Sequence, residues 1–360
     1  MGHNARLTRA RTQLAQIRID ALLITQLANI RYLCGFSGST GALVISERQT
    51  VFFTDGRYSE QAREEVRGAG IRIRKGKSAL VAAAEWLCRQ SQIRRIGIEP
   101  SHLSVADRTS LARSLRPGAR LVESPPIVER LRMIKDSDEI AKIRDACHLG
   151  VELFDRVLRV LRAGVRESDV AGELEFAARK AGVDQMAFST IVAGGSRSAL
   201  PHGRASRARI PAQGFVVCDF GVILAGYCSD MTRTVCVGRI TNDQRVAYNA
   251  VKDAHQAALN SIKPGITVAK VDQAARKLLR ERKLERFFTH STGHGLGLEI
   301  HEAPRVAAGQ REQLRPGMVI TIEPGVYLPG RYGVRIEDTI VVTETGYEIL
   351  TPCSKDLITV

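Results

Sequence analysis

The chain has 360 residues, of which 44% are hydrophobic and 25% charged, a composition typical of a globular protein, and its length suggests two domains. Its longer apolar runs, such as residues 79–84, fall far short of the ~20 residues that cross a bilayer, so we expect no membrane partner. The formal net charge of +15 comes largely from arginine spread along the chain, without basic runs rich in aromatic residues, so we also expect no nucleic-acid partner.

The cysteines and the first residues indicate a reducing compartment. Seven cysteines occur without any Cys-x-x-Cys pair, which argues against a thiolate zinc site. The N-terminal stretch is charged and lacks the apolar segment of a signal peptide. We therefore expect a cytoplasmic protein with free thiols.

In residues 20–125, short apolar runs alternate with helical patterns. β-Branched runs bounded by turn residues predict strands at residues 21–25, 42–45, 51–54, 71–74 and 95–98. Apolar positions three and four residues apart predict helices at residues 59–66, 80–90 and 104–115. This alternation indicates a small α/β domain. Because Pro125 and Pro126 interrupt the pattern, we place a non-catalytic α/β domain at residues 1–128 and a second domain at residues 129–360.

The second part of the chain begins with a long helical stretch over residues 127–161, which restarts near Asp136. Further helices are predicted at residues 168–181, 243–261 and 268–283. Four β-rich segments form two pairs with short glycine-containing connections, at residues 215–223 and 226–237 and at residues 318–327 and 333–342. Paired strands with separate helices predict an α+β domain with a mainly antiparallel sheet.

Acidic residues occur inside these β-rich segments, where apolar residues are expected. Asp219 and Asp230 are 11 residues apart and Glu323 and Glu337 are 14 apart, so each pair can meet across one hairpin. A buried carboxylate is unfavourable unless it is paired or binds a cation. A single such acid is best explained by a strand cap or an arginine partner, but two acidic hairpins in one domain favour a site for two divalent cations.

Histidine is concentrated near these acids. The chain has eight histidines, and three of them, His290, His294 and His301, fall within twelve residues of a glycine-rich segment. A fourth, His202, lies in a segment that reads as a loop, after Pro201. Because the glycine-rich segment does not have a helical pattern, we expect its histidines to face a site.

Several stretches of the second part resemble the catalytic domain of the creatinase and methionine-aminopeptidase superfamily, which has the pita-bread fold. They are SALPHG at 198–203, VCDFG at 217–221, YCSDMTRT at 227–234, TGHGLGLEIHE at 292–302, IEPGVY at 322–327 and GVRIED at 333–338. Together they are similar to the proline-specific branch, aminopeptidase P and prolidase. Residues 29–38 and 53–58 resemble the non-catalytic domain of bacterial Xaa-Pro peptidases. The resemblance implies an α/β N-terminal domain and an α+β, creatinase-like pita-bread catalytic domain with a curved, mainly antiparallel sheet.

The resemblance implies five metal ligands, Asp219, Asp230, His294, Glu323 and Glu337. Asp230 and Glu337 would bridge two divalent ions, Asp219 would bind one ion, and His294 and Glu323 would bind the other. This oxygen-rich donor set suits Mn²⁺, with Co²⁺ or Zn²⁺ as alternatives. Two such ions lower the pKa of a shared water, and the resemblance implies Glu323 as the proton shuttle.

Four further residues are expected to act on the substrate. His290 is the candidate donor to the oxyanion of the tetrahedral intermediate, and His202 is expected to help hold the substrate. His301 and Arg335 are expected to orient the substrate or the metal ligands.

The implied substrates are small peptides with proline in the second position. We expect Xaa-Pro aminopeptidase activity first and prolidase activity, restricted to dipeptides, second. An Xaa-Pro bond has no N–H and a fixed ring, so its site needs an apolar wall, for which Phe188 and Tyr227 are candidates, although two ordinary core aromatics explain them equally well. A creatinase-like C–N hydrolase and a non-catalytic binding protein are further alternatives that the intact ligand set disfavours. The resemblance also implies a homodimer.

Overall fold

The structure is a computed structural model that describes residues 2–360. Its contacts divide it into two compact units, one ending at Arg132 and the other comprising Met133–Val360. This division lies close to the boundary predicted after residue 128. Among the described residues, no helix is both long and apolar enough to span a bilayer.

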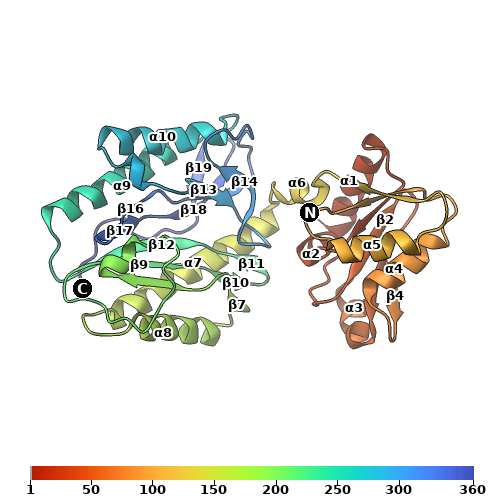
Figure 1. Ribbon diagram of the computed structural model, residues 1–360, viewed down its shortest axis with the longest axis horizontal. Coiled ribbons are helices and arrows are strands. Elements are labelled where there is room, and N and C mark those ends of the chain that lie inside the picture. Colours follow the sequence, from red (N-terminus) through yellow and green to blue (C-terminus); the bar gives the residue numbers. More distant parts are fainter. Residues whose placement is uncertain (1) are drawn as a thin grey trace. The chain divides into compact units, whose positions relative to one another are not determined.

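The first unit contains a six-stranded mixed sheet in the order β4-β3-β2-β1-β5-β6 (Figure 1). Its strands are β1 (Ala21–Ile24), β2 (Ala42–Ser46), β3 (Thr50–Asp55), β4 (Gly70–Arg74), β5 (Arg95–Ile98) and β6 (Arg120–Glu123). Its helices are α1 (His3–Gln16), α2 (Leu27–Cys34), α3 (Ser59–Glu65), α4 (Ala79–Cys88), α5 (Val105–Ser114) and α6 (Ile127–Arg132), with a 3₁₀ turn η1 (Gly56–Tyr58). The α/β prediction for this part is confirmed.

Local sequence accounts for two of these helices. Ser78 and Ser104 precede α4 and α5, and each hydroxyl accepts a hydrogen bond from a backbone N–H of the first helical turn. Ala83 and Leu87 of α4 are fully or almost fully buried in the cluster that also contains strand residues of the sheet. The short elements α2 and β6 were not among the predicted elements, because eight and four residues give too little periodicity to stand out.

The second unit combines four long helices with four antiparallel groups of strands. Its helices are α7 (Ser137–Val160), α8 (Glu167–Lys180), α9 (Asn242–Ser261) and α10 (Val268–Glu281), with 3₁₀ turns η2 (Gly195–Ala199) and η3 (Glu285–Phe287). Its strands are β7 (Gln185–Met186), β8 (Ile191–Gly194), β9 (Gly214–Phe220), β10 (Val222–Leu224), β11 (Tyr227–Cys228), β12 (Met231–Val237), β13 (Gly293–Gly295), β14 (Glu302–Val306), β15 (Val319–Ile322), β16 (Gly325–Leu328), β17 (Tyr332–Arg335), β18 (Asp338–Val342) and β19 (Tyr347–Ile349). The sheet orders are β12-β9-β8, β14-β13-β15-β18-β19, β11-β10-β7 and β16-β17.

Two hydrophobic cores hold these strands between the helices. Helices α9 and α10 lie along one side of the strands and α8 along the other (Figure 1). Leu259 of α9 is buried in one cluster with Ile320 and Ile340 of β15 and β18, whereas Phe154 of α7 is buried in another with Val216 of β9. The prediction of an α+β domain with antiparallel sheets is confirmed.

Both predicted acidic hairpins are interrupted in the middle. Strand β9 pairs with β12 as far as Phe220 and Met231, while β10 and β11 join a different sheet. Likewise, β15 pairs with β18 as far as Ile322 and Asp338, while β16 and β17 form a separate two-stranded sheet. Each β-rich segment therefore contains two strands that belong to different sheets, and the antiparallel pairing within each hairpin is confirmed.

Two residues explain where the hairpins are interrupted. A Cβ atom at Gly221 would lie 2.0 Å from the carbonyl oxygen of Ser229, so only glycine permits this close approach of the two chain segments. Pro324 directly follows Glu323 and has no N–H to donate to a ladder. The interruptions leave carboxylates at strand ends, where their side chains can converge.

Candidate metal centre

Four acidic side chains and one imidazole meet where the hairpins are interrupted. Asp219 lies near the end of β9 and Asp230 directly precedes β12. Glu323 directly follows β15 and Glu337 directly precedes β18, whereas His294 lies in β13, the neighbour of β15. All five predicted ligands line a single cavity.

The donor atoms of these residues are spaced as ligands of shared cations are. Atoms of Asp230, His294 and Glu337 lie within 4.8 Å of one another. His294 Nε2 is 3.6 Å from Asp230 Oδ2 and 3.5 Å from Glu323 Oε1. Ligand atoms that are each ~2 Å from one cation lie about 3 Å or slightly more from one another, so these separations fit donors around a common ion.

The electrostatics of the acid cluster also fit divalent cations. Burial raises the pKa of Asp230 and that of Glu337 well above their usual values, and the repulsion of neighbouring carboxylates raises both further. Burial is also the main reason why the pKa of Glu323 rises to about 7. Carboxylates that repel one another in this way are relieved by protons or by cations.

Arg335 braces one of the predicted ligands, Asp219. Its Nη2 forms a hydrogen-bonded ion pair with Asp219 Oδ2, and its Nη1 donates to the Tyr327 hydroxyl at 2.6 Å and to the carbonyl of Pro201 at 3.1 Å. The other carboxylate oxygen, Asp219 Oδ1, is buried and has no hydrogen-bond partner among residues 2–360. A buried oxygen without a donor is unfavourable, so this atom is suited to receive a cation.

Two further predicted ligands, His294 and Glu337, are oriented by neighbouring groups. His294 Nδ1 contacts the carbonyl oxygen of Gly295 at 3.0 Å, and donation there leaves the lone pair of Nε2 directed at the acids. Burial lowers the pKa of His294 and so favours the neutral imidazole that binds metals. Thr232 Oγ1 donates to Glu337 Oε2 at 2.6 Å. These residues therefore fit divalent cations by donor type, spacing and orientation.

His290 has partners at both ring nitrogens. Its Nδ1 is 2.8 Å from the carbonyl oxygen of Ser291, and its Nε2 is 2.8 Å from the Tyr327 hydroxyl. Nδ1 also lies 4.0 Å from Glu323 Oε2. Burial, followed by the charge of Arg335, lowers the pKa of His290 to about 3, so its ring is neutral near pH 7. The predicted donation to an oxyanion would require His290 to release one of these partners.

The predicted ligands line a cavity of about 600 Å³, a size common for small-molecule sites. The predicted residues His202, His290, His301 and Phe188 all line this cavity. His202 and His301 are exposed. The ring of His301 lies edge-to-face on that of His294, with centroids 4.5 Å apart, so His301 is placed beside a predicted metal ligand.

Tyr227 lies outside the cavity, contrary to its predicted place in the apolar wall. Its side chain is buried in a separate hydrophobic cluster, and its hydroxyl donates to Glu139 at 3.0 Å. It is therefore one of the core aromatics that formed the alternative interpretation. Ile191 and Pro201 line the cavity together with Phe188 instead.

Sequence reasoning missed two arginines of the cavity, Arg204 and Arg305. Both are exposed, and neither has an acidic partner among residues 2–360. Their positions in the sequence could have indicated that they lie at the site, because Arg204 is two residues after His202 and Arg305 is four residues after His301. Their charges leave the cavity with two guanidinium groups that no carboxylate of the described chain neutralises.

Comparisons with known proteins agree with this geometry. The Metallopeptidase family M24 profile matches residues 141–344, and the Creatinase/Prolidase N-terminal domain profile matches residues 6–134. The chain belongs to metallopeptidase family M24. The M24 assignment and the structure confirm the predicted combination of a creatinase-type N-terminal domain and a pita-bread catalytic domain. They also confirm that the chain is an enzyme of a divalent-metal-dependent peptidase family.

Relatives of this M24 peptidase match it over nearly their whole length. The Xaa-Pro dipeptidase of Pyrococcus horikoshii is 37% identical over 345 residues, which cover 94% of this chain and 95% of the relative. The structure of an Xaa-Pro dipeptidase from Bacillus anthracis has a TM-score of 0.96 at 38% identity and covers both chains completely. The structure of an X-Pro aminopeptidase from Thermotoga maritima has a TM-score of 0.88 at 34% identity and covers 97% of this chain and 100% of its own.

Proposed function

We propose that this M24 peptidase is an Xaa-Pro dipeptidase that uses two divalent cations. The observation that carries the proposal is the cluster of four carboxylates and one imidazole in a cavity that also holds two arginines without acidic partners. Two of the three relatives described above are named Xaa-Pro dipeptidases. This support reverses the order predicted from the sequence, in which aminopeptidase activity came first.

The proposed ligands of the two cations are Asp219, Asp230, His294, Glu323 and Glu337. Bound divalent cations would polarise the scissile carbonyl and lower the pKa of a water molecule. Mn²⁺ is the proposed ion because the donor set is rich in carboxylate oxygen, with Co²⁺ and Zn²⁺ as alternatives. Two cations would also offset the four negative charges that repel one another in the metal-free cluster.

Glu323 is the proposed proton carrier. A general acid–base group must lie within reach of the proton that it moves, and Glu323 lines the cavity together with the other proposed ligands. Its Oε1 is 3.4 Å from the hydroxyl of Thr321, which limits its orientation. We propose that Glu323 takes a proton from the attacking water and delivers it to the proline nitrogen, which leaves as a secondary amine.

His202 is the proposed donor to the developing oxyanion. It lines the cavity, is exposed, and has no hydrogen-bond partner for its ring among residues 2–360. His290 differs, because Ser291 and Tyr327 already contact its two ring nitrogens. We therefore propose that His290 supports the cavity wall and that His202 makes the direct contact. His301 and Phe188 stay candidates for substrate contact from the same cavity.

Arg204 and Arg305 favour the dipeptidase over the aminopeptidase. In an Xaa-Pro dipeptide the proline that follows the scissile bond carries a free carboxylate, and a guanidinium group binds such a carboxylate in bidentate fashion. In a longer peptide this position is an uncharged amide. A cavity with two unneutralised arginines therefore favours substrates that end at proline.

The test compares an Xaa-Pro dipeptide with the same dipeptide as its C-terminal amide and with an Xaa-Pro-Yaa tripeptide, all with Mn²⁺. Loss of a hydrogen-bonded charge contact of about 1.5–3 kcal/mol should lower kcat/KM for the amide and the tripeptide by roughly 10–100-fold. An Ala-Ala dipeptide tests the requirement for proline. A tripeptide hydrolysed as well as or better than the dipeptide would support the aminopeptidase, the activity of the Thermotoga maritima relative.

Two further features stay predictions from the sequence. A homodimer and a cytoplasmic location are expected from the resemblance and from the cysteine and N-terminal patterns. Gel filtration with light scattering measures the first, and fractionation of cells that express the full chain measures the second. The creatinase-like and non-catalytic alternatives are disfavoured by the converging ligands and by the relatives that are named Xaa-Pro dipeptidases.

A further inference from the structure

A buried ionic cluster lies directly behind the candidate metal ligands. Its centre is Asp338, the first residue of β18 and the neighbour of the ligand Glu337. Asp338 has no exposed surface, and Arg233, Thr351 and Lys355 donate to its carboxylate at 2.7, 3.0 and 2.8 Å. None of these four residues lines the cavity. The proposed reaction therefore has no direct use for them.

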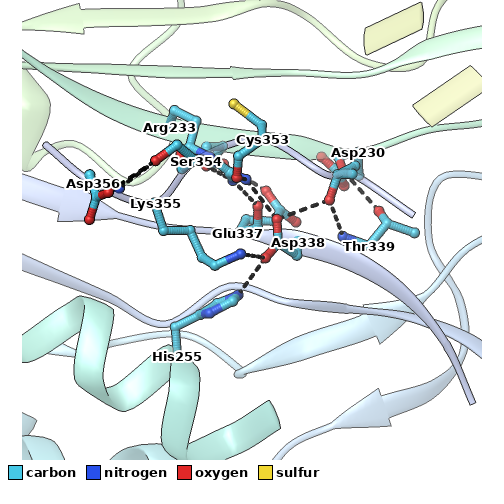
Figure 2. A network of polar contacts seen from close by, with 12 residues as sticks. Asp230, Arg233, His255, Glu337, Asp338, Thr339, Cys353, Ser354, Lys355 and Asp356 are labelled. Atoms are coloured by element: carbon cyan, nitrogen blue, oxygen red, sulfur yellow. Dashed lines mark hydrogen bonds and ion pairs between the residues drawn. The ribbon is translucent and has the colours of Figure 1, made fainter. Parts of the chain in front are cut away.

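Arg233 uses all five of its N–H groups inside the protein. Its Nη1 donates to the carbonyl oxygens of Thr232 and Glu337. Its Nη2 donates to Asp338 and to the carbonyl of Cys353 at 2.8 Å, and its Nε donates to the carbonyl of Ser354 at 3.0 Å. One guanidinium thus connects strand β12, the backbone of a metal ligand and the segment 353–354 (Figure 2).

The residues around Asp338 fix ligands from two different strands. Glu337 N–H donates to the carbonyl of Thr232 at 3.1 Å, and the Thr232 hydroxyl donates to the Glu337 carboxylate. On the other side of Asp338, the Thr339 hydroxyl donates to the carbonyl of Asp230 at 2.8 Å (Figure 2). Three consecutive residues, 337–339, therefore supply one ligand, anchor it, and hold the backbone of a second ligand.

We propose that Asp338 and Arg233 are positioning residues of the metal centre, and that Lys355 completes the anchor from segment 353–356. The inference rests on the proposed metal dependence. A buried ion pair is in itself weak evidence for stability, because desolvation offsets much of its attraction. The pair instead fixes the backbone of Glu337, while Thr339, the residue after Asp338, holds the backbone of Asp230. Groups behind metal ligands typically influence metal affinity or activity 10–100-fold.

The contacts of segment 353–356 supply a matched pair of variants. Lys355 donates to Asp338 (Figure 2). Its neighbour Asp356 is exposed and pairs instead with Lys252 of α9. Lys355→Met removes one donor to Asp338 and leaves Arg233 in place. Asp356→Asn removes an ion pair of the same segment without touching Asp338, so it controls for a general loosening of the segment.

The experiment measures Mn²⁺ binding by calorimetry to the full chain after metal removal, for wild type, Asp338→Asn, Lys355→Met and Asp356→Asn. Circular dichroism establishes that each variant is folded, and unfolding in chelator measures stability without metal. We expect the Mn²⁺ dissociation constant to rise 10–100-fold in Asp338→Asn and about tenfold in Lys355→Met. In Asp356→Asn it should stay within twofold of wild type. At saturating Mn²⁺, kcat should fall in the first two variants while KM changes little.

Unchanged Mn²⁺ affinity in folded Lys355→Met and Asp338→Asn would overturn the positioning role, even if both variants unfold more easily in chelator. Should Asp338→Asn fail to fold, Lys355→Met decides alone, because most of the anchor is retained in it. If the wild type binds Mn²⁺ tightly and the variants bind it equally tightly, only this inference is contradicted. A wild-type protein that binds no divalent cation contradicts the proposed function and this inference together.

Discussion

Replacing Glu323 by glutamine should stabilise the metal-free protein at pH 8 while it abolishes activity. Glu323 lies among other carboxylates in a buried cluster, and burial raises its pKa from 4.5 to about 7. Glutamine has nearly the same shape and can still accept from the Thr321 hydroxyl, but it carries no charge at any pH. The substitution therefore separates the electrostatic cost of this carboxylate from its packing.

The magnitude follows from the rise in pKa. The folded protein retains the proton up to about pH 7, whereas the unfolded chain releases it near pH 4.5, so the free energy of unfolding falls as pH rises through this window. At about 1.4 kcal/mol for each pKa unit, the destabilisation is about 3 kcal/mol at pH 8 and less than about 1 kcal/mol at pH 5. Without metal, Glu323→Gln should therefore be more stable than the wild type by these amounts. In excess Mn²⁺ the wild type should be the more stable of the two, because the cation stabilises it through a ligand that the variant lacks.

Urea unfolding of chelator-treated protein at pH 5 and pH 8 measures both differences. Glu344 is exposed, so Glu344→Gln is a control for the substitution itself and should change stability by less than about 0.5 kcal/mol at either pH. Hydrolysis of an Xaa-Pro dipeptide should fall by on the order of 10³ or more in Glu323→Gln, since a ligand and the proton carrier are lost together. Metal-free Glu323→Gln that is no more stable than wild type at pH 8 would refute the electrostatic reasoning.

Three further predictions concern the other residues of the cavity. His294→Ala should lower the metal content of purified protein measured by mass spectrometry, and a full complement of metal would exclude His294 as a ligand. His202→Ala should retain its metal but lower kcat about 10²–10³-fold. His290→Ala should lower kcat only about tenfold, because the ring nitrogens of His290 already have partners. Equal effects of the two substitutions on kcat would refute the assignment of distinct roles. At least one of the variants Arg204→Gln and Arg305→Gln should have a KM for an Xaa-Pro dipeptide that is raised roughly 10–100-fold, with the KM for the dipeptide amide unchanged. An equal effect on both substrates would show that neither arginine binds the carboxylate.

The converging acids could be predicted from the sequence because their pattern is local. Asp219 and Asp230, like Glu323 and Glu337, interrupt apolar β-rich segments at a spacing that fits one hairpin each. The first break could not be predicted in the same way, because the residues on both sides of Gly221 are apolar and suited to strands. Pro324 was an available signal for the second break, since proline has no N–H to donate to a ladder. Only the close approach of Gly221 to Ser229 in the folded chain shows why the first ladder ends there.

The hydrogen bonds that tune the site depend on residues far apart in the chain. Arg335 reaches Asp219 across 116 residues, and His290 reaches Tyr327 across 37 residues. The spacing of residues in the sequence does not predict contacts between residues so far apart, so the sequence did not predict the partners of His290. The prediction for Tyr227 failed for a related reason, since an aromatic beside a ligand strand can face either the cavity or the core.

A proline-specific peptidase whose five-ligand cluster works only with divalent cations must lose its activity with its metal. Release of free proline from an Xaa-Pro dipeptide, measured before chelation, after chelation and after Mn²⁺ is restored, tests this dependence. We expect chelation to abolish proline release and Mn²⁺ to restore it, with full recovery at about two ions per chain. Proline release that persists unchanged in protein shown to be free of metal would mean that the cluster needs no cation.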